Sequence, residues 1–302
     1  MITKSARNLS VHLTRQGVLH LIAQNTRNLP VHVILIVAVI IFAFPVYLAF
    51  IGSTWDAGTI GRGAMPLTPG PDLVENYTNT LTSAQGGRVK GVAVQGLLWN
   101  SLQMALLIAI GKIIISVLSA YAIAFFDFRF RMFFFGMIFL TWMLPIEVRI
   151  APTYKVMSDL GLINTMAGLT IPLMASATGT LLFRQFFLTI PDEYVEAAKI
   201  DGAGPLRFFW SIVLPLSRTN IAALFVVLFI YGWNQYLWPL LITTTRDMET
   251  IVVGIVKMIG TGEAQTDWNL VMSGTVFALL PPVLVVILMQ QWFVKGLVQT
   301  EK

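Results

Sequence analysis

The residues of this chain that could do chemistry are a few charged side chains inside long apolar segments. Lys112 lies in the middle of the run 97–126, and Glu147 and Arg149 lie near the end of the run 133–150. Ionisable residues at membrane depth are costly, and they commonly mark the pathway of a substrate or an ion. Ammonium and guanidinium groups bind oxyanions, and arginine presents a bidentate donor fork. We therefore predict that Arg149 and Lys112 contact an anionic substrate.

A polar stripe supports a pathway on the helix that carries Lys112. At about 100° per residue, Ser101, Lys112 and Ser119 fall within about 20° of one another. Such a stripe faces a bundle interior or a water-filled cavity, although an interhelix hydrogen bond or a structural ion pair would explain it equally well. Glu147 and Arg149 can likewise pair with each other or extend to the membrane interface.

Polar and aromatic residues also meet near the end of the apolar run 219–242. Aromatic side chains near a helix end usually form the belt at the membrane interface. Trp233 and Asn234 would equally suit the hydroxyl groups of a polar ligand. We therefore include both residues, with Ser101 and Glu147, among the predicted residues of the substrate pathway.

No catalytic or metal-binding constellation is present in the sequence. Gly111-Lys112 is not a phosphate-binding loop, because no glycine lies five residues before Gly111 and an isoleucine follows Lys112. The three histidines are all N-terminal and lack metal-ligand partners, and the absence of cysteine excludes thiol chemistry. We predict no catalytic residue, no metal site and no cofactor bound by this chain.

The elements that position these residues are membrane-spanning helices. Of the 302 residues, 56% are hydrophobic and only 12% are charged, which excludes an ordinary soluble protein. Several apolar runs reach the roughly 20 residues that span a bilayer. The sequence therefore predicts an all-α membrane protein with six transmembrane helices, at about 31–51, 97–126, 133–150, 163–190, 219–242 and 270–294.

Basic residues predict the orientation of these helices. Lys and Arg are enriched in short cytoplasmic loops, and they gather here in the tail 1–30, at Arg129 and Arg131, and at Lys295. We therefore predict an N-in, C-in topology. The tail is a basic cytoplasmic segment, and 31–302 form a single transmembrane domain with a core at about 94–295. Because the basic residues lie at helix ends, the net charge of +5 does not indicate nucleic acid.

The same orientation places the segment 191–218 in the cytoplasm, where it reads as two short helices separated by a turn. Glu193 opens the first helix, and Gly202 suits its C-terminus. The second helix carries Leu206 and Trp210, more apolar surface than a solvated loop needs. This surface packs either on the rest of the chain, in the membrane interface, or on another protein.

The segment resembles the EAA loop of ATP-binding-cassette (ABC) importer permeases. The pattern is E-A-A, three residues, G, nine residues, I-x-L-P, and every fixed position is filled here. The resemblance implies the type I ABC importer permease fold, in which this cytoplasmic loop docks into a cleft on a separate ATPase subunit. The implied coupling residues are Glu193, Glu196, Ala197, Ala198, Asp201, Gly202 and Pro215.

Other segments resemble the carbohydrate-uptake branch of these permeases, namely Asn100–Leu102, Leu182–Phe187, Ile190–Glu193 and Trp233–Pro239. Within that branch, three segments are most similar to permeases of sn-glycerol 3-phosphate importers: Leu144–Ile150, Gly168–Thr178 and Lys295–Val298. Most sugar permeases carry an uncharged residue where Arg149 stands, so this departure fits a phosphate-bearing substrate such as sn-glycerol 3-phosphate or a glycerophosphodiester.

The resemblance also implies the partners and the location. These are a homologous second permease, a homodimeric ATPase that binds ATP and magnesium, an extracytoplasmic substrate-binding protein, and the bilayer of the bacterial cytoplasmic membrane. The outer loop Gly260, Thr261, Gly262 and Glu263 would reach toward the binding protein. A neutral sugar or oligosaccharide is the alternative cargo. A membrane enzyme or a self-contained channel is disfavoured, because no catalytic cluster is present and the EAA pattern is complete.

Overall fold

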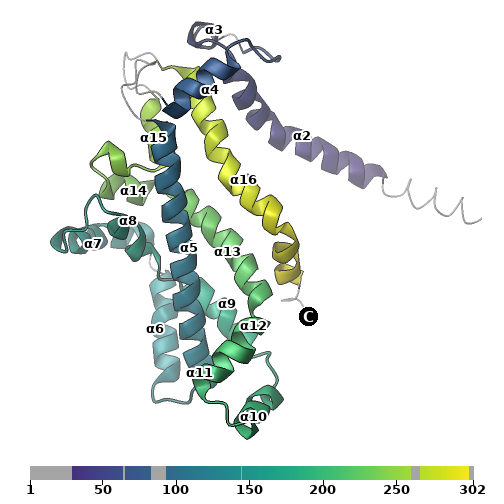
Figure 1. The fold of residues 1–302 in the computed structure, drawn as a ribbon, viewed down its shortest axis with the longest axis vertical. Helices are drawn as coiled ribbons and strands as arrows, with labels where there is room; N and C mark the ends of the chain where they lie inside the picture. The colour runs from purple at the N-terminus through teal and green to yellow at the C-terminus, as the bar shows by residue number, and fades with distance from the viewer. Residues whose placement is uncertain (1–28, 64, 83–92, 144, 260–265, 299–302) are drawn as a thin grey trace, which may run out of the picture.

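A computed structural model describes residues 29–63, 65–82, 93–143, 145–259 and 266–298 of the chain (Figure 1). Helix is the only regular secondary structure within these ranges. Most of the predicted basic tail and the predicted outer loop Gly260–Glu263 lie outside them. The helices up to and including the first helix of the predicted coupling loop are α2 Leu29–Gly52, α3 Ala57–Gly61, α4 Leu73–Thr82, α5 Val94–Phe125, α6 Arg131–Met143, α7 Ile146–Asp159, α8 Met166–Thr170, η1 Ile171–Leu173, α9 Ala177–Phe187 and α10 Asp192–Ile200.

From Pro205 onward most helices are short, and only α13 Arg218–Trp233 and α16 Trp268–Val298 are long. The short ones are α11 Pro205–Phe208, the π-helical turn η2 Phe209–Val213, α12 Leu214–Leu216, α14 Leu237–Ile242, η3 Arg246–Met248 and α15 Ile251–Met258. Figure 1 shows α10 and α11 at one end of the elongated molecule and α3 and α4 at the other.

Helix α5 is the central element, and α9 and α13 pack along it while α16 packs on α13 (Figure 1). Small residues let these helices approach closely, as is common where helices pack in membranes. A Cβ atom at Gly179 of α9 would lie 2.5 Å from the Oγ atom of Ser116 on α5. The buried core continues along α5 through Ala105, Ala109 and Ala120.

Three of the described helices are long and apolar enough to cross a membrane: Pro30–Gly52, Val94–Phe125 and Trp268–Trp292. Two further pairs of helices pass the same test together but are bent, by 48° at the break between η1 and α9 and by 70° between α12 and α13. The described residues therefore contain three candidate spans, or up to five if each bent pair is one span. The number six and the N-in, C-in orientation remain predictions.

The structure differs from the predicted run 133–150, which is not one helix. Helix α6 ends at Met143, and α7 begins at Ile146 with Pro145 as its N-cap. Proline lacks the backbone N–H and disfavours helix at the preceding residue, so the helix is interrupted at Pro145. Arg149 consequently lies in the first turn of a new helix instead of at the end of a span.

The runs 163–190 and 219–242 are also interrupted. Helices α8 and η1 end before α9 begins at Ala177, and α13 ends at Trp233 before α14 begins at Leu237. These breaks let short helices cover the flank of α5, where Trp238 of α14 donates a hydrogen bond to the carbonyl oxygen of Gly168 at 3.1 Å. Broken helices of this kind are tolerated at membrane depth where other protein groups satisfy the backbone.

The end of the molecule that carries α3 and α4 is held by amide side chains. Asn76 of α4 donates to the carbonyl oxygens of Ser53 and Trp55, which follow α2. Asn269 at the start of α16 donates to the Oδ1 atom of Asn76 at 2.9 Å. One asparagine thus joins three elements, whereas the remainder of α2 extends away from the bundle (Figure 1).

Candidate functional site

The predicted coupling loop forms a helical hairpin whose turn depends on Gly202. The N–H of Ala203 donates to the carbonyl oxygen of Ala198 at 2.8 Å, and the N–H of Gly202 donates to that of Lys199 at 3.1 Å. These two bonds make a Schellman motif, which ends a helix with a left-handed residue. Gly202 supplies this conformation with a φ of +66°, which a residue with a Cβ atom adopts only at a cost.

The hairpin is fixed to the bundle by buried side chains and one hydrogen bond. Ala198 of α10 is buried in the same cluster as Phe208 and Phe209. Tyr121, near the end of α5, donates its hydroxyl to the carbonyl oxygen of Pro205 at 2.7 Å, and its ring lies 4.9 Å from that of Phe209. The hairpin is therefore in direct contact with the end of α5.

The other face of the hairpin is exposed and is rich in both acidic and apolar groups. Of the predicted coupling residues, Ala198 is buried, Pro215 is partly buried, and the other five are exposed. Four large side chains beside them are also exposed, which we call the coupling surface: Tyr194, Ile200, Leu206 and Trp210. Ile200 has 86% of its surface exposed, an unusual position for isoleucine unless a partner covers it.

Sequence analysis missed Tyr194 and Ile200 as candidate contacts. Both are within the EAA segment, but a helix of nine residues is too short for hydrophobic periodicity to separate a buried face from a docking face. The signal that could have found Ile200 is its place beside the helix-ending turn, where no residue of the same helix can cover it.

The second candidate site is formed by residues of three separate helices, α5, α7 and α13. Lys112 of α5 is only 8% exposed, and its Nζ atom lies 4.0 Å from the ring centroid of Tyr231 on α13. Arg149 of α7 is exposed and lies within electrostatic range of both Lys112 and Tyr231. The structure therefore places near each other the two cations that the sequence singled out, and it adds Tyr231, which no sequence pattern indicated.

The direction of the Lys112 side chain follows from helix geometry. Side chains on an α-helix lean toward its N-terminus, so the long chain of Lys112 extends along α5 toward the α3 and α4 end. Tyr231 lies in the last turn of α13, which runs toward the same end. The structure does not describe the side chain of Glu147, so the assignment of this residue to the substrate pathway remains a prediction.

Ser101 and Trp233 make contacts within the protein in this conformation. The Oγ atom of Ser101 accepts a hydrogen bond from the N–H of Ile251 at 2.7 Å. Trp233 is 2% exposed and donates its Nε1–H to the carbonyl oxygen of Ala278 on α16 at 3.1 Å. Asn234 is exposed and caps the C-terminus of α13. Their assignment to the substrate pathway remains a prediction.

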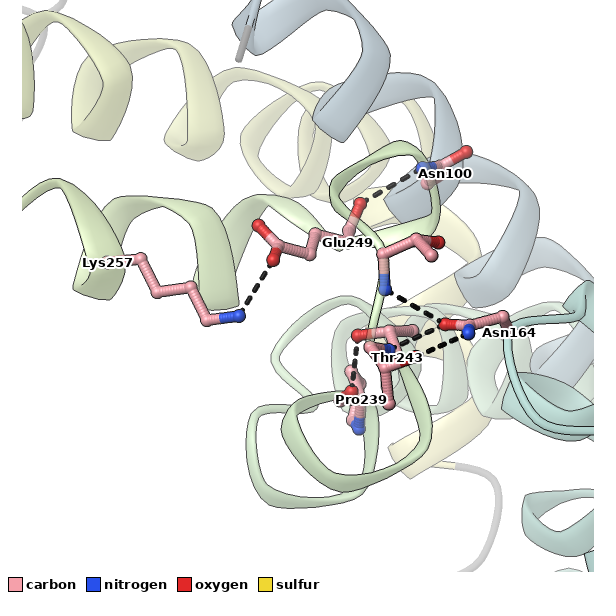
Figure 2. A network of polar contacts seen from close by, with 8 residues as sticks. Asn100, Asn164, Pro239, Thr243, Glu249 and Lys257 are labelled. Atoms are coloured by element: carbon pink, nitrogen blue, oxygen red, sulfur yellow. Dashed lines mark hydrogen bonds and ion pairs between the residues drawn. The ribbon is translucent and has the colours of Figure 1, made fainter. Parts of the chain in front are cut away.

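A network of polar contacts fixes the segment between α14 and α15 on this side of the bundle, as Figure 2 shows. Asn100 of α5 donates to the carbonyl oxygen of Glu249 at 3.0 Å, and the buried carboxylate of Glu249 pairs with Lys257 at 2.7 Å. Asn164 accepts a hydrogen bond from the N–H of Thr244 at 2.6 Å. The turn before α8 and the segment before α15 are thereby joined, and Asn100 holds that segment on α5.

Comparison with known proteins supplies an independent result. The family described as "Binding-protein-dependent transport system inner membrane component" matches residues 112–299. The sn-glycerol-3-phosphate transport system permease protein UgpE of Brucella melitensis is 61% identical over 277 residues, 91% of this chain and 97% of that protein.

Proteins of the same name from two other organisms are also similar over nearly their whole length. The protein of Agrobacterium fabrum is 62% identical over 273 residues, 90% of this chain and 96% of the relative. The protein of Yersinia pestis is 53% identical over 281 residues, 92% of this chain and 99% of the relative. The similarity thus includes α2 and the coupling hairpin as well as the matched family region.

Proposed function

The chain belongs to the binding-protein-dependent transport system inner membrane component family, and from this membership we propose that it imports sn-glycerol 3-phosphate as the permease subunit of an ATP-driven transporter. The observation that carries the proposal is 61% identity, across 97% of its length, to a permease named for that substrate. The two neighbouring cations, Lys112 and Arg149, support an anionic cargo, because neither a sugar nor another neutral solute would offset their charge.

The chain contributes a path and a mechanical link, and ATP hydrolysis takes place on another subunit. A homodimeric ATPase binds ATP and magnesium and docks against the coupling surface. A second, homologous permease completes the path, and an extracytoplasmic protein delivers the substrate. Support for docking comes from the apolar residues Ile200, Leu206 and Trp210, which the described part of the chain leaves exposed.

In this mechanism, closure of the two ATPases on ATP pushes the hairpin of α10 and α11. The hydrogen bond from Tyr121 to Pro205 and the packing of Phe208 and Phe209 pass that displacement to α5. Because α5 carries Lys112 and packs along α9 and α13, these helices rock together and alternately open the path to either side. Binding energy from ATP thus shifts the populations of two conformations.

The test is ATP-dependent uptake by the complete transporter, reconstituted in vesicles with its binding protein. Labelled sn-glycerol 3-phosphate is the cargo, and unlabelled sn-glycerol 3-phosphate, glycerophosphocholine and maltose are the competitors. We expect competition by the first two and none by maltose. Uptake of labelled maltose without uptake of labelled sn-glycerol 3-phosphate would assign the chain to a neutral-sugar importer, and uptake that persists without the ATPase would contradict the ABC mechanism.

A further inference from the structure

Lys112 is a buried cation that contacts no carboxylate among the residues whose side chains the structure describes. Within the part of the chain where side chains are described, which excludes Glu147, the ion pairs join Lys155 to Asp159 and Lys257 to Glu249. The Lys112 ammonium instead lies over the face of the Tyr231 ring. Such a contact replaces only part of the hydration that a buried cation loses, so the site still favours an anion.

A second cation, Arg149, increases the preference of the site for an anion. Its guanidinium lies close enough to Lys112 and to Tyr231 for an electrostatic interaction with each. Two like charges repel each other unless an anion binds with them, and burial of Lys112 reduces the screening of this repulsion by water. Because α5, α7 and α13 supply one group each, the arrangement exists only when all three helices are in place.

We propose that Lys112, Arg149 and Tyr231 together form an oxyanion site for a phosphate monoester, in which Tyr231 positions the Lys112 ammonium. The face of the Tyr231 ring holds the ammonium in place while the site is empty. When the phosphate arrives, the ammonium and guanidinium bind its oxygens, and the phenolic hydroxyl donates a hydrogen bond to one of them. The identification of the monoester with sn-glycerol 3-phosphate rests on the proposed function.

The charge of the ligand explains why two cations and a neutral donor suit a monoester. A phosphate monoester carries about −1.5 to −2 charges at neutral pH and three acceptor oxygens. A phosphodiester carries one charge, so it satisfies the two cations less completely, and a sugar satisfies neither. The site should therefore bind monoesters best, diesters less well and neutral solutes not measurably.

The experiment measures equilibrium binding of labelled sn-glycerol 3-phosphate and, separately, of labelled inorganic phosphate to the transporter in nanodiscs without its binding protein. The variants are Lys112→Met, Lys112→Arg, Tyr231→Leu and Tyr231→Phe. The matched controls are Lys155→Met and Tyr236→Leu, because Lys155 is an exposed lysine and Tyr236 is 37% exposed, against 36% for Tyr231.

Loss of a hydrogen bond to a charged group weakens binding by about tenfold to hundredfold, so we expect Lys112→Met and Tyr231→Leu to reduce the affinity for both anions within this range. Tyr231→Phe keeps the ring and loses the hydroxyl, so its effect should be smaller. Lys112→Arg keeps the charge and should retain most of the affinity. Assembly of every variant with the ATPase, measured by gel filtration, excludes misfolding as the cause.

The outcomes separate the inference from the proposed function. If the unchanged transporter binds neither anion, or if Lys112→Met and Tyr231→Leu leave the affinity unchanged, the oxyanion site is wrong even where uptake of sn-glycerol 3-phosphate persists. If phosphate binds at this site and the variants weaken it while uptake of sn-glycerol 3-phosphate is absent, the site stands and the proposed cargo is wrong.

Discussion

The coupling surface and the oxyanion site differ in how the chain builds them. The coupling hairpin comes from one continuous segment, and local hydrogen bonds around Gly202 set its shape. The oxyanion site comes from Lys112, Arg149 and Tyr231, each on a different helix. The first is exposed and apolar and therefore suits a protein partner, whereas the second contains a buried charge and therefore suits a small anion.

This difference has a mechanical consequence. A site built from one segment can move as a unit without losing its shape, which is what a lever between two subunits requires. A site shared by three helices changes its shape when those helices move relative to one another. Rocking of the bundle would therefore leave the docking face intact while it alters the affinity for the anion, as alternating access requires.

The largest expected effect tests whether the hairpin acts as one unit. Gly202→Val places a β-branched residue at a positive φ, which such residues rarely adopt. We expect ATP-dependent uptake to fall by about thirtyfold or more for every cargo, because the left-handed conformation costs up to about 2 kcal/mol and the helix end that presents Ile200 is lost with it. Uptake and ATPase activity in vesicles are the measurements.

Gly204→Ala is the control for that variant, because Gly204 has a φ of −68° and no atom within 4 Å of an added Cβ. Normal uptake by Gly202→Val would contradict the idea that the coupling hairpin transmits motion as one unit. A loss in both variants would show that the hairpin tolerates no added side chain at all.

The next effect tests the selectivity of the oxyanion site. Arg149→Gln removes one of the two cations, so uptake of sn-glycerol 3-phosphate should fall by about tenfold, the value of a charge-assisted hydrogen bond. ATPase activity without substrate should not change, because Arg149 is remote from the coupling hairpin. Equal uptake by the variant and the unchanged protein would remove Arg149 from the phosphate site.

A smaller effect is expected on the affinity between the subunits. Ile200→Ser removes apolar area that a partner would bury. Complete burial is worth about 1.5–3 kcal/mol, and partial burial should make binding of the ATPase several-fold to tenfold weaker in the variant. Val74→Ser is the control, since Val74 is 73% exposed at the opposite end. Titration of the purified ATPase onto nanodiscs measures the affinity, and identical curves for both variants would exclude Ile200 from the docking surface.

The smallest effect concerns the link between the hairpin and α5. Tyr121→Phe removes the hydrogen bond to Pro205 and should cost about 1 kcal/mol, seen as a lower ratio of substrate imported to ATP hydrolysed. Tyr47→Phe removes a comparable bond to the carbonyl oxygen of Leu67 near the other end and should leave the ratio unchanged. If both variants preserve the ratio, packing alone transmits the motion.

The sequence predicted the local features of this protein well because their causes are local. Glycine at a helix end and the complete EAA pattern located the hairpin and its turn at Gly202. Long apolar runs located α2, α5 and α16. The resemblance to ABC importer permeases was confirmed by the family and by relatives over nearly the whole chain.

Tertiary structure decided which residues meet. Hydrophobicity alone could not show that the chain breaks at Pro145 and places Arg149 on a new helix, because apolar residues continue on both sides of the break. Nor could spacing along α5 identify Tyr231, more than a hundred positions away in the chain, as the group beneath Lys112. Periodicity reports the face on which a residue lies, whereas packing of whole helices determines what that face meets.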